Sequence, residues 1–209
     1  MLTVGPIQEN CFLVRASAEA SRAVLVDPGE EAPRLLAALE GAGVTLDAIL
    51  VTHCHFDHIG AVAPVARATG AEVWCPAGET QVLADIMAYV PYAGFGPYES
   101  WEAEHAVTGG DRLELAGLSW EVIDTPGHSP GHVTYAVESE DALFSGDVLF
   151  QGSIGRTDLP GGDLPTLLDS VGTLLDRFPD AAVVHPGHMG LTTLGRERAS
   201  NPFLQSRAT

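Results

Sequence analysis

The chain has 209 residues, of which 45% are hydrophobic, and its formal net charge is −18 at pH 7. This length suits one well-cored domain, so we expect a single domain over residues 1–209. All ten basic residues are arginines. A surface this acidic repels nucleic-acid phosphates, which argues against a nucleic-acid partner.

Short apolar runs alternate with helix-like stretches in the first half of the chain. We expect strands at residues 11–15, 23–26, 48–51 and 73–75. We expect helices at residues 30–39, with acidic residues in the first turn, at 59–68 and at 81–89. Residues 91–104 are rich in Gly, Pro and aromatics without a regular period, which fits either a lid over a site or a packed connection.

The second half repeats the strand pattern. We expect strands at residues 112–115, 118–124, 132–137, 142–144 and 182–184, and an amphipathic helix at 164–178. Strand-rich halves interleaved with helices predict sheets that are covered by helices, which is an α+β fold.

A dense group of metal-ligand side chains follows the expected strand at 48–51. It reads His53-Cys54-His55-Phe56-Asp57-His58. Ionisable side chains at this density repel and desolvate one another unless a positive charge organises them. Neutral imidazoles and carboxylates are the usual ligands of zinc and similar divalent metals, so the segment predicts a metal site rather than a solvated turn.

Three further candidate ligands stand singly, each in a turn after an expected strand. They are His128, Asp147 and His188, and each lies next to Gly or Pro. Such residues let the backbone turn sharply and present the side chain. Each is weak evidence alone, but with the first group they bring the number of candidate ligands to seven.

This set resembles the metallo-β-lactamase superfamily, and more narrowly its glyoxalase II (hydroxyacylglutathione hydrolase) branch, of the short single-domain type. The matching segments run along nearly the whole chain: Gly5-Pro6-Ile7-Gln8-Glu9-Asn10, Asp27-Pro28-Gly29, the ligand motifs, Gly152-Ser153-Ile154-Gly155-Arg156-Thr157-Asp158, Thr192-Thr193-Leu194-Gly195 and Asn201-Pro202-Phe203-Leu204. The resemblance implies a four-layer αβ/βα sandwich with the metal site at one edge of the sheets.

The resemblance also implies how the ligands divide between two metal ions. The first ion would be bound by His53, His55 and His128, the second by Asp57, His58 and His188, and Asp147 would bridge them. Zinc is the expected metal, with iron or manganese as alternatives.

Two adjacent cations imply hydrolysis by attack of a metal-bound hydroxide, because they lower the pKa of water and polarise a carbonyl. Asp57 is the expected catalytic residue, since it can orient the hydroxide or manage a proton. The implied substrate is a small-molecule thioester such as S-D-lactoylglutathione.

The sequence departs from the glyoxalase II pattern near the expected substrate site. Arg156 stands where the branch has a lysine that meets the glutathione carboxylate, and we expect it to contact a substrate anion. Asp158 stands in place of a tyrosine, and its carboxylate would repel that of glutathione. Met189-Gly190 replaces the usual Gly-Pro. These departures bear on the substrate more than on the reaction class.

Other functions stay open on the same fold. Persulfide dioxygenases share the segment Gly155 to Asp158 and would hold one iron at His53, His128 and Asp147. A lactone or other ester hydrolase, or a β-lactamase, would use the same two metals. A non-enzymatic metal protein is disfavoured, because a structural site is normally closed by four ligands.

The remaining signals concern location and supporting residues. The three cysteines fit no disulfide framework, and neither a signal peptide nor a membrane span is evident, so we expect a cytoplasmic protein without a membrane partner. The sequence defines no oligomeric state. Asp27 either orients a ligand histidine or only forms a turn. His132 and His185 are expected to be structural, and Cys54 is expected in the core.

Overall fold

The computed structural model describes residues 1–90 and 92–205 and contains two six-stranded sheets. Backbone contacts divide the chain into two units. Unit 1 comprises Met1–Val107 and Glu114–Leu118, and unit 2 comprises Thr108–Leu113 and the chain from Ser119 onward. Each unit has its own layers and core. That the chain forms one domain over residues 1–209 stays a prediction.

The sheet of unit 1 has the order β1-β2-β3-β4-β5-β6. Its strands are β1 Leu2–Val4, β2 Glu9–Val14, β3 Arg22–Val26, β4 Thr45–Leu50, β5 Glu72–Pro76 and β6 His105–Val107. The strands β3 to β6 are parallel, whereas β1, β2 and β3 are joined antiparallel. The carboxyl ends of parallel strands open at one edge of a sheet, where binding residues commonly gather. Asp27 follows β3 at that edge, and the segment that leads to His53 follows β4.

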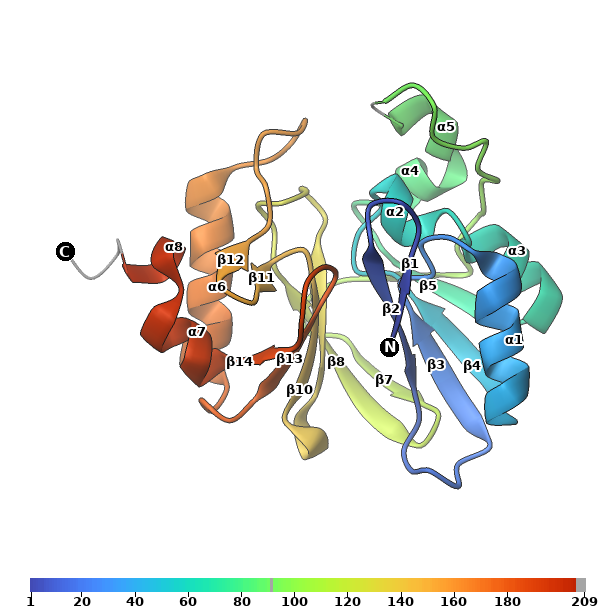
Figure 1. The fold of residues 1–209 in the computed structure, drawn as a ribbon, viewed down its shortest axis with the longest axis horizontal. Helices are drawn as coiled ribbons and strands as arrows, with labels where there is room; N and C mark the ends of the chain where they lie inside the picture. The colour runs from blue at the N-terminus through green and yellow to red at the C-terminus, as the bar shows by residue number, and fades with distance from the viewer. Residues whose placement is uncertain (91, 206–209) are drawn as a thin grey trace. The chain divides into compact units, whose positions relative to one another are not determined.

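Helices cover the sheet of unit 1. They are α1 Ala32–Ala42, α2 Phe56–Ile59, α3 Val62–Thr69, α4 Thr80–Ala84 and α5 Ile86–Tyr89. The two longest, α1 and α3, lie beside each other along strands β3 and β4 (Figure 1). They bury Leu35, Leu39, Val62 and Val65 in the core of this unit. This spacing of three and four residues places the buried side chains on one face of each helix.

Two helices predicted as continuous are broken, and the prediction is corrected there. In the helix expected at 59–68, Ile59 ends α2 and the remainder forms α3 from Val62, because the backbone N–H of Ala61 donates to the carbonyl of Pro28 at 3.0 Å. The helix expected at 81–89 is α4 and α5, because the N–H of Ile86 donates to Ser100 Oγ at 3.1 Å. In both cases a distant segment takes a donor that helix continuation needs.

The first helix also begins later than predicted. It starts at Ala32, and Glu31 precedes it with a left-handed φ of 56°. The acidic residues expected in its first turn therefore lie outside it. The Glu31 carboxylate instead accepts from the backbone N–H of Gly5 at 2.9 Å and from Arg34 at 2.9 Å.

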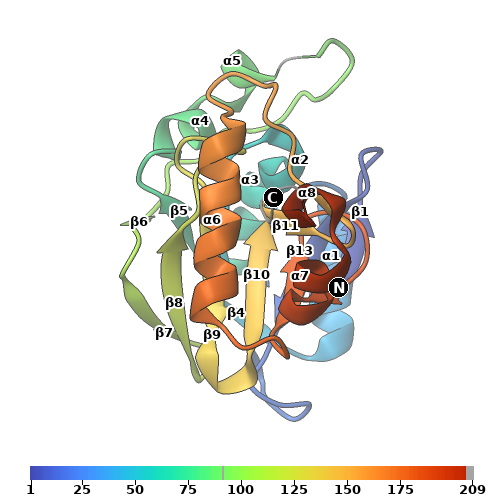
Figure 2. The same cartoon turned by 90° about the vertical axis from the view of Figure 1, so that its left-hand side faces the viewer.

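The second sheet has the order β14-β13-β10-β9-β8-β7. Its strands are β7 Arg112–Leu115, β8 Leu118–Asp124, β9 Val133–Val137, β10 Ala142–Gly146, β13 Val183–Pro186 and β14 Thr192–Thr193. Helix α6 Leu164–Arg177 lies along β9 and β10 in unit 2 (Figure 2). Its side chains Leu167, Val171 and Leu174 join the core cluster of these strands. Asp163 precedes the helix as its N-cap, and its carboxylate accepts from the N–H of Thr166.

Several short elements of unit 2 were not predicted. They are the 3₁₀ turn η1 Glu138–Glu140, the hairpin β11 Leu149–Phe150 and β12 Ser153–Ile154, strand β14, and the helices α7 Leu194–Ser200 and α8 Pro202–Gln205. Glu197 ties some of them together. Its buried carboxylate accepts from the N–H of Gly152 at 2.8 Å, from Thr192 Oγ1 at 2.5 Å and from Asn201 Nδ2 at 2.9 Å. Among the described residues, no helix is long and apolar enough to cross a membrane.

Candidate metal centre

Four of the seven predicted ligands belong to unit 1 and lie just beyond the carboxyl end of β4. The backbone is extended at His55 and turns into α2 at Phe56. In an extended segment side chains alternate, so His53 and His55 share one side and Cys54 takes the other. Cys54 is indeed buried, with its Sγ 3.5 Å from that of Cys75. Its expected place in the core is confirmed, and burial raises the pKa of its thiol.

Hydrogen bonds fix the tautomer of His53. The hydroxyl of Thr52 donates to Asp27 Oδ2 at 2.7 Å. Because that hydrogen is already used, the Thr52 oxygen can only accept from His53 Nδ1, which lies 3.1 Å away. His53 therefore carries its proton on Nδ1, and its Nε2 has the lone pair that a metal ligand needs.

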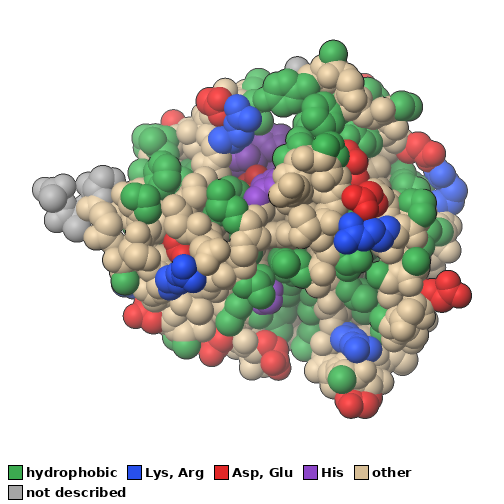
Figure 3. All heavy atoms as spheres, in the orientation of Figure 1, with side chains coloured by type: hydrophobic (Ala, Val, Ile, Leu, Met, Phe, Trp, Pro, Cys, Tyr) green, Lys and Arg blue, Asp and Glu red, His purple; other side chains and the backbone are tan. Residues whose placement is uncertain are grey.

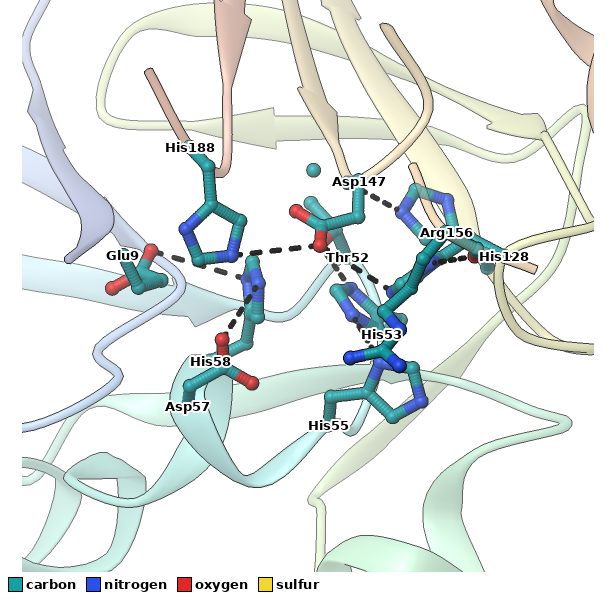
Figure 4. Close-up of polar contacts among 12 residues, drawn as sticks. Glu9, Thr52, His53, His55, Asp57, His58, His128, Asp147, Arg156 and His188 are labelled. Carbon is teal, nitrogen blue, oxygen red and sulfur yellow. Dashed lines mark hydrogen bonds and ion pairs between the residues drawn. The ribbon is translucent and has the colours of Figure 1, made fainter. Parts of the chain in front are cut away.

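The same carboxylate orients His58, whose side chain is fully buried. His58 Nδ1 lies 3.0 Å from Asp27 Oδ2. It also lies 3.9 Å from Glu9 Oε1 (Figure 4). A carboxylate only accepts, so Nδ1 carries the proton and Nε2 the lone pair. The backbone at Asp27 is also left-handed, with φ 48°. Asp27 thus both forms a turn and orients ligand histidines, and the two readings offered by the sequence hold together.

His55 and Asp57 complete the ligand segment of unit 1. His55 Nδ1 lies 3.1 Å from His53 Nε2, and Asp57 Oδ2 lies 3.9 Å from His58 Nε2. Two ligands on a tetrahedral zinc ion, each at about 2.0–2.1 Å, are roughly 3.3 Å apart. The spacing of the two imidazoles therefore suits a shared cation. The buried carboxylates of Glu9 and Asp27 beside His58 add negative charge, which a cation would offset.

Aromatic side chains of the segment 92–104 pack against the segment that holds His55 and Asp57. Phe56 lies between the two ligands His55 and Asp57, and its ring centroid is 4.8 Å from that of Phe95 and 5.9 Å from that of Tyr98. Tyr98 donates to Glu30 Oε1 at 2.6 Å, and burial together with this carboxylate raises the pKa of the phenol. These contacts are those of a packed connection within unit 1. Pro91, the first residue of the segment, lies outside the described residues.

The other three predicted ligands belong to unit 2, where they follow the ends of three strands. His128 comes after β8, Asp147 after β10 and His188 after β13. Asp147 Oδ2 lies 3.4 Å from His128 Nε2 and 3.5 Å from His188 Nε2 (Figure 4). One carboxylate oxygen is therefore shared by two imidazoles, which is the arrangement that a bridging ligand requires.

A main-chain group orients His128. Its Nδ1 lies 2.7 Å from the carbonyl oxygen of Arg156, which can only accept. His128 therefore carries its proton on Nδ1 and has the lone pair on Nε2, like His53 and His58. By contrast, His185 stacks on Phe144 with centroids 4.7 Å apart, and burial lowers its pKa to about 4. It stays neutral within the sheet, in agreement with its expected structural role.

The side chain of Arg156 is engaged by its own neighbour. Arg156 Nε and Nη2 donate to the two carboxylate oxygens of Asp158 at 2.6 and 2.7 Å. This hydrogen bonding lowers the pKa of Asp158 to about 2. Both side chains are exposed to solvent. The pair explains how an acidic residue is accommodated beside the expected anion contact, and the role of Arg156 in substrate binding stays a prediction.

Comparison with known proteins identifies the family. The model of the metallo-beta-lactamase superfamily matches residues 4–188. The hydroxyacylglutathione hydrolase GloC of Haemophilus influenzae is 34% identical over 100% of this chain and 98% of its own length. The chain therefore belongs to the metallo-β-lactamase superfamily, and the predicted resemblance to the hydroxyacylglutathione hydrolases is confirmed at the level of sequence.

Two solved structures share the fold along almost the whole chain. The BLEG-1 B3 metallo-beta-lactamase is 41% identical with a TM-score of 0.90, and the match covers 97% of both chains. TTHA1623, solved in a di-iron-bound form, is 40% identical with a TM-score of 0.77 over 97% of this chain and 98% of its own. The predicted metallo-β-lactamase fold is confirmed. This fold implies divalent metal ions, and the family supports hydrolase activity in general.

Sequence reasoning missed two residues that support the ligands. The sequence predicts no role for Glu9 beyond its place in a family motif, yet its buried carboxylate lies beside His58. His132 was expected only to be structural, yet it contacts the backbone of Asp147. The available signal was chemical: a second histidine in the turn that holds His128, and an acidic residue at the start of a buried strand.

Proposed function

We propose that this protein is a dinuclear metal-dependent hydrolase of thioesters of the S-D-lactoylglutathione type. The observation that carries the metal site is that His53, His58 and His128 each donate Nδ1–H to a protein acceptor, which leaves Nε2 as a ligand. The substrate class is taken from the hydroxyacylglutathione hydrolase of H. influenzae, which the chain resembles along its whole length.

The proposed ligands divide as the family relation implies. His53, His55 and His128 would hold one metal ion, Asp57, His58 and His188 would hold the other, and Asp147 would contribute to both. We propose zinc, with iron or manganese as alternatives, because imidazole and carboxylate ligands suit all three. The di-iron form of TTHA1623 supports iron as an alternative.

When bound, such cations lower the pKa of a water molecule to about 7 and polarise a carbonyl. Thioester hydrolysis joins a water oxygen to the acyl carbon and breaks the carbon–sulfur bond, so one proton must pass from water to the leaving thiolate. Asp57 is the proposed proton carrier. Its carboxylate retains 14% side-chain exposure and lies 3.9 Å from His58 Nε2, so it can take a proton from water and release it again.

Arg156 is the proposed contact for a substrate anion. Its guanidinium is already paired bidentately with Asp158, so a substrate carboxylate would have to displace that partner. An exposed pair of this kind contributes little free energy. We therefore propose that Arg156 orients the substrate and adds little to its affinity.

The proposed substrate is a small molecule in the cytoplasm, and neither a nucleic acid nor a membrane is a proposed partner. The net charge of −18 disfavours a nucleic-acid partner, because an acidic surface repels phosphate backbones. On the face drawn in Figure 3 the blue side chains of the arginines lie apart from one another, several of them beside red acidic side chains. Phosphate backbones are bound by clustered basic residues, which is a different pattern.

The decisive experiment measures S-D-lactoylglutathione hydrolysis by protein loaded with zinc or iron, against a chelated sample. We expect turnover that is lost on chelation. As a residue control, Asp57→Asn should retain one metal per chain or more and lose most of the turnover. Two bound metals without any thioester turnover would contradict the proposal.

Hydrolysis of a lactam is a second candidate, because the BLEG-1 B3 metallo-beta-lactamase is 41% identical to this chain. A chromogenic β-lactam and an aliphatic lactone, assayed with the same metal-loaded sample, separate these substrates from the thioester. A sample with one iron per chain that consumed oxygen with glutathione persulfide would instead indicate the dioxygenase alternative and contradict a hydrolase.

A further inference from the structure

His132 is a buried histidine of unit 2 that has no place among the proposed ligands. It lies directly before β9, and its Nε2 lies 3.1 Å from the backbone nitrogen of Asp147. Its Nδ1 lies 3.0 Å from Thr125 Oγ1, which in turn lies 3.0 Å from Thr134 Oγ1. All four residues are buried. A polar chain therefore joins the ends of the three neighbouring strands β8, β9 and β10.

The hydrogen atoms of this chain can be assigned one by one. The N–H of Asp147 can only donate, so His132 Nε2 must carry the lone pair. A neutral imidazole has a single N–H, which therefore stands on Nδ1 and is donated to Thr125 Oγ1. The Thr125 hydroxyl then donates its own hydrogen to Thr134. The hydrogen bonds run in one direction, from Asp147 through His132 and Thr125 to Thr134.

The backbone N–H at the head of this chain lies outside the pairing of the neighbouring strands β9 and β10. The pairing of β10 with β9 ends at Phe144 and Tyr135, so Asp147 lies beyond the ladder. A buried N–H at such a position needs an acceptor, and His132 supplies it. The carbonyl side of Asp147 is closely covered as well, because a Cβ at Gly155 would lie 1.9 Å from that oxygen.

We propose that His132 is a positioning residue that fixes the main chain of Asp147, and with it the carboxylate oxygen shared by His128 and His188. It has the same tautomer as the ligand histidines, but its lone pair is used on a backbone N–H. The inference rests on the proposed metal site. Ligand positions must be held within about 0.5 Å, which makes the support of a shared ligand consequential.

The test measures Zn²⁺ affinity by competition with a chelating dye in wild type and four variants. His132→Phe removes the acceptor, and His132→Gln can restore one through its Oε1. Thr125→Val leaves the imidazole in place but removes the acceptor that fixes its tautomer. Thr192→Val is the matched control, because it also removes a buried hydroxyl bond in unit 2, the one to Glu197.

We expect His132→Phe to weaken Zn²⁺ binding by about 10- to 100-fold, the usual effect of losing a residue that supports a ligand. Thr125→Val should act in the same direction with a smaller effect, His132→Gln should recover part of the affinity, and Thr192→Val should stay near wild type. Nitrogen NMR of the metal-free wild type should place the His132 proton on Nδ1.

Several results would overturn the positioning role. They are unchanged affinity in His132→Phe, an equal loss in Thr125→Val and Thr192→Val, or a proton on His132 Nε2. Thioester turnover is recorded separately. A wild type that binds Zn²⁺ without thioester turnover contradicts the proposed function and leaves this test valid, whereas a wild type that binds no Zn²⁺ overturns both.

Discussion

The ligand segments of the two units are oriented in different ways. In unit 1 the four proposed ligands lie within one segment of six residues, and the carboxylate of Asp27 accepts hydrogen bonds from Thr52 and His58. In unit 2 the ligands follow three separate strands, and main-chain groups take part: the carbonyl of Arg156 holds His128, and the N–H of Asp147 contacts His132. The Asp27 side chain thus orients histidines in unit 1, whereas backbone groups near the ends of strands take part in orienting the proposed ligands of unit 2.

The difference predicts where each set is vulnerable. A single carboxylate can be deleted by substitution, so His53 and His58 in unit 1 depend on one position. A backbone carbonyl or N–H cannot be deleted in this way, so the ligands of unit 2 are sensitive to changes that displace the chain, among them the loss of His132 proposed above. The following predictions are ordered from the largest expected effect to the smallest.

Substitutions that crowd the backbone carbonyl of Asp57 or Asp147 should have the largest effect on stability. The effect should be similar in the two units. A Cβ at Gly29 would lie 1.7 Å from the carbonyl oxygen of Asp57, and one at Gly155 would lie 1.9 Å from that of Asp147. We expect Gly29→Ala and Gly155→Ala each to lower the free energy of unfolding by about 3 kcal/mol or more, since backbone must move. Urea denaturation measures this.

Gly41→Ala is the control for both glycine variants. A Cβ at Gly41 would meet nothing within 4 Å, and the residue lies inside α1. It should raise the free energy of unfolding by about 0.5–1 kcal/mol, because alanine is the better helix former. If Gly29→Ala or Gly155→Ala were as well tolerated as this control, the close contacts would have no energetic weight.

Removal of the Asp27 carboxylate should affect the proposed ligands of unit 1, because Asp27 is the acceptor that orients them. Asp27→Ala leaves the buried N–H of Thr52 and the His58 ring without their shared acceptor, which costs about 1–3 kcal/mol for each group left unsatisfied. Metal affinity should fall about 10- to 100-fold. Asp27→Asn tolerates the left-handed backbone but presents an amide, so it should recover stability more than metal affinity. Calorimetry of both variants measures the change in stability, and metal titration measures the change in affinity.

Equal recovery of stability and metal affinity in Asp27→Asn would contradict this account. It would mean that Asp27 matters as a turn residue and that its negative charge does not orient the histidines.

Loss of the Tyr98 hydroxyl should have a modest effect on unit 1. Tyr98→Phe keeps the ring against Phe56 and removes the hydrogen bond to Glu30. The expected loss is about 0.5–1.5 kcal/mol in the free energy of unfolding, the usual worth of such a bond. Urea denaturation measures it, with Tyr89→Phe at an exposed tyrosine of α5 as control. A large drop in metal affinity would mean that the aromatic segment also sets the ligand geometry.

The ionisation of Asp158 should make the smallest contribution to stability, and that contribution should change with pH only in the acidic range. Its folded-state pKa is lowered from 3.8 to about 2, chiefly by hydrogen bonding from Arg156. A lowered pKa stabilises the fold above pH 3.8, and this contribution is lost as pH falls toward 2. In Arg156→Gln the pKa of Asp158 should return toward 3.8, as carbon NMR of the carboxyl group can measure. An unchanged pKa would mean that another group holds it low.

The fold and the ligands were predictable from the sequence where the signal is local. The strand at 48–51 and the segment from His53 to His58 are contiguous, and the helix at 164–178 has a regular apolar period. Helix breaks were not predictable, because they depend on distant partners. The N–H of Ala61 finds the carbonyl of Pro28, and that of Ile86 finds Ser100, and neither pairing leaves a mark in the local pattern.

The supporting residues of the site were harder to predict than the ligands. The bond between His132 and Asp147 spans 15 residues, and the contact between Glu9 and His58 joins β2 to α2. A lone histidine or glutamate has many uses, and only the register of neighbouring strands decides among them. The sequence predicts a role for the side chain of Arg156, whereas its backbone carbonyl contacts the proposed metal ligand His128.

The shared tautomer of His53, His58 and His128 has a consequence for metal exchange. Because protein acceptors already hold each Nδ1–H, replacing one divalent ion by another requires no rearrangement of these hydrogen bonds. Selection between ions would then rest on ligand type, coordination geometry and metal availability, and not on a change of tautomer. The same chain produced in zinc-rich and in iron-rich medium should then carry different metals on an identical scaffold.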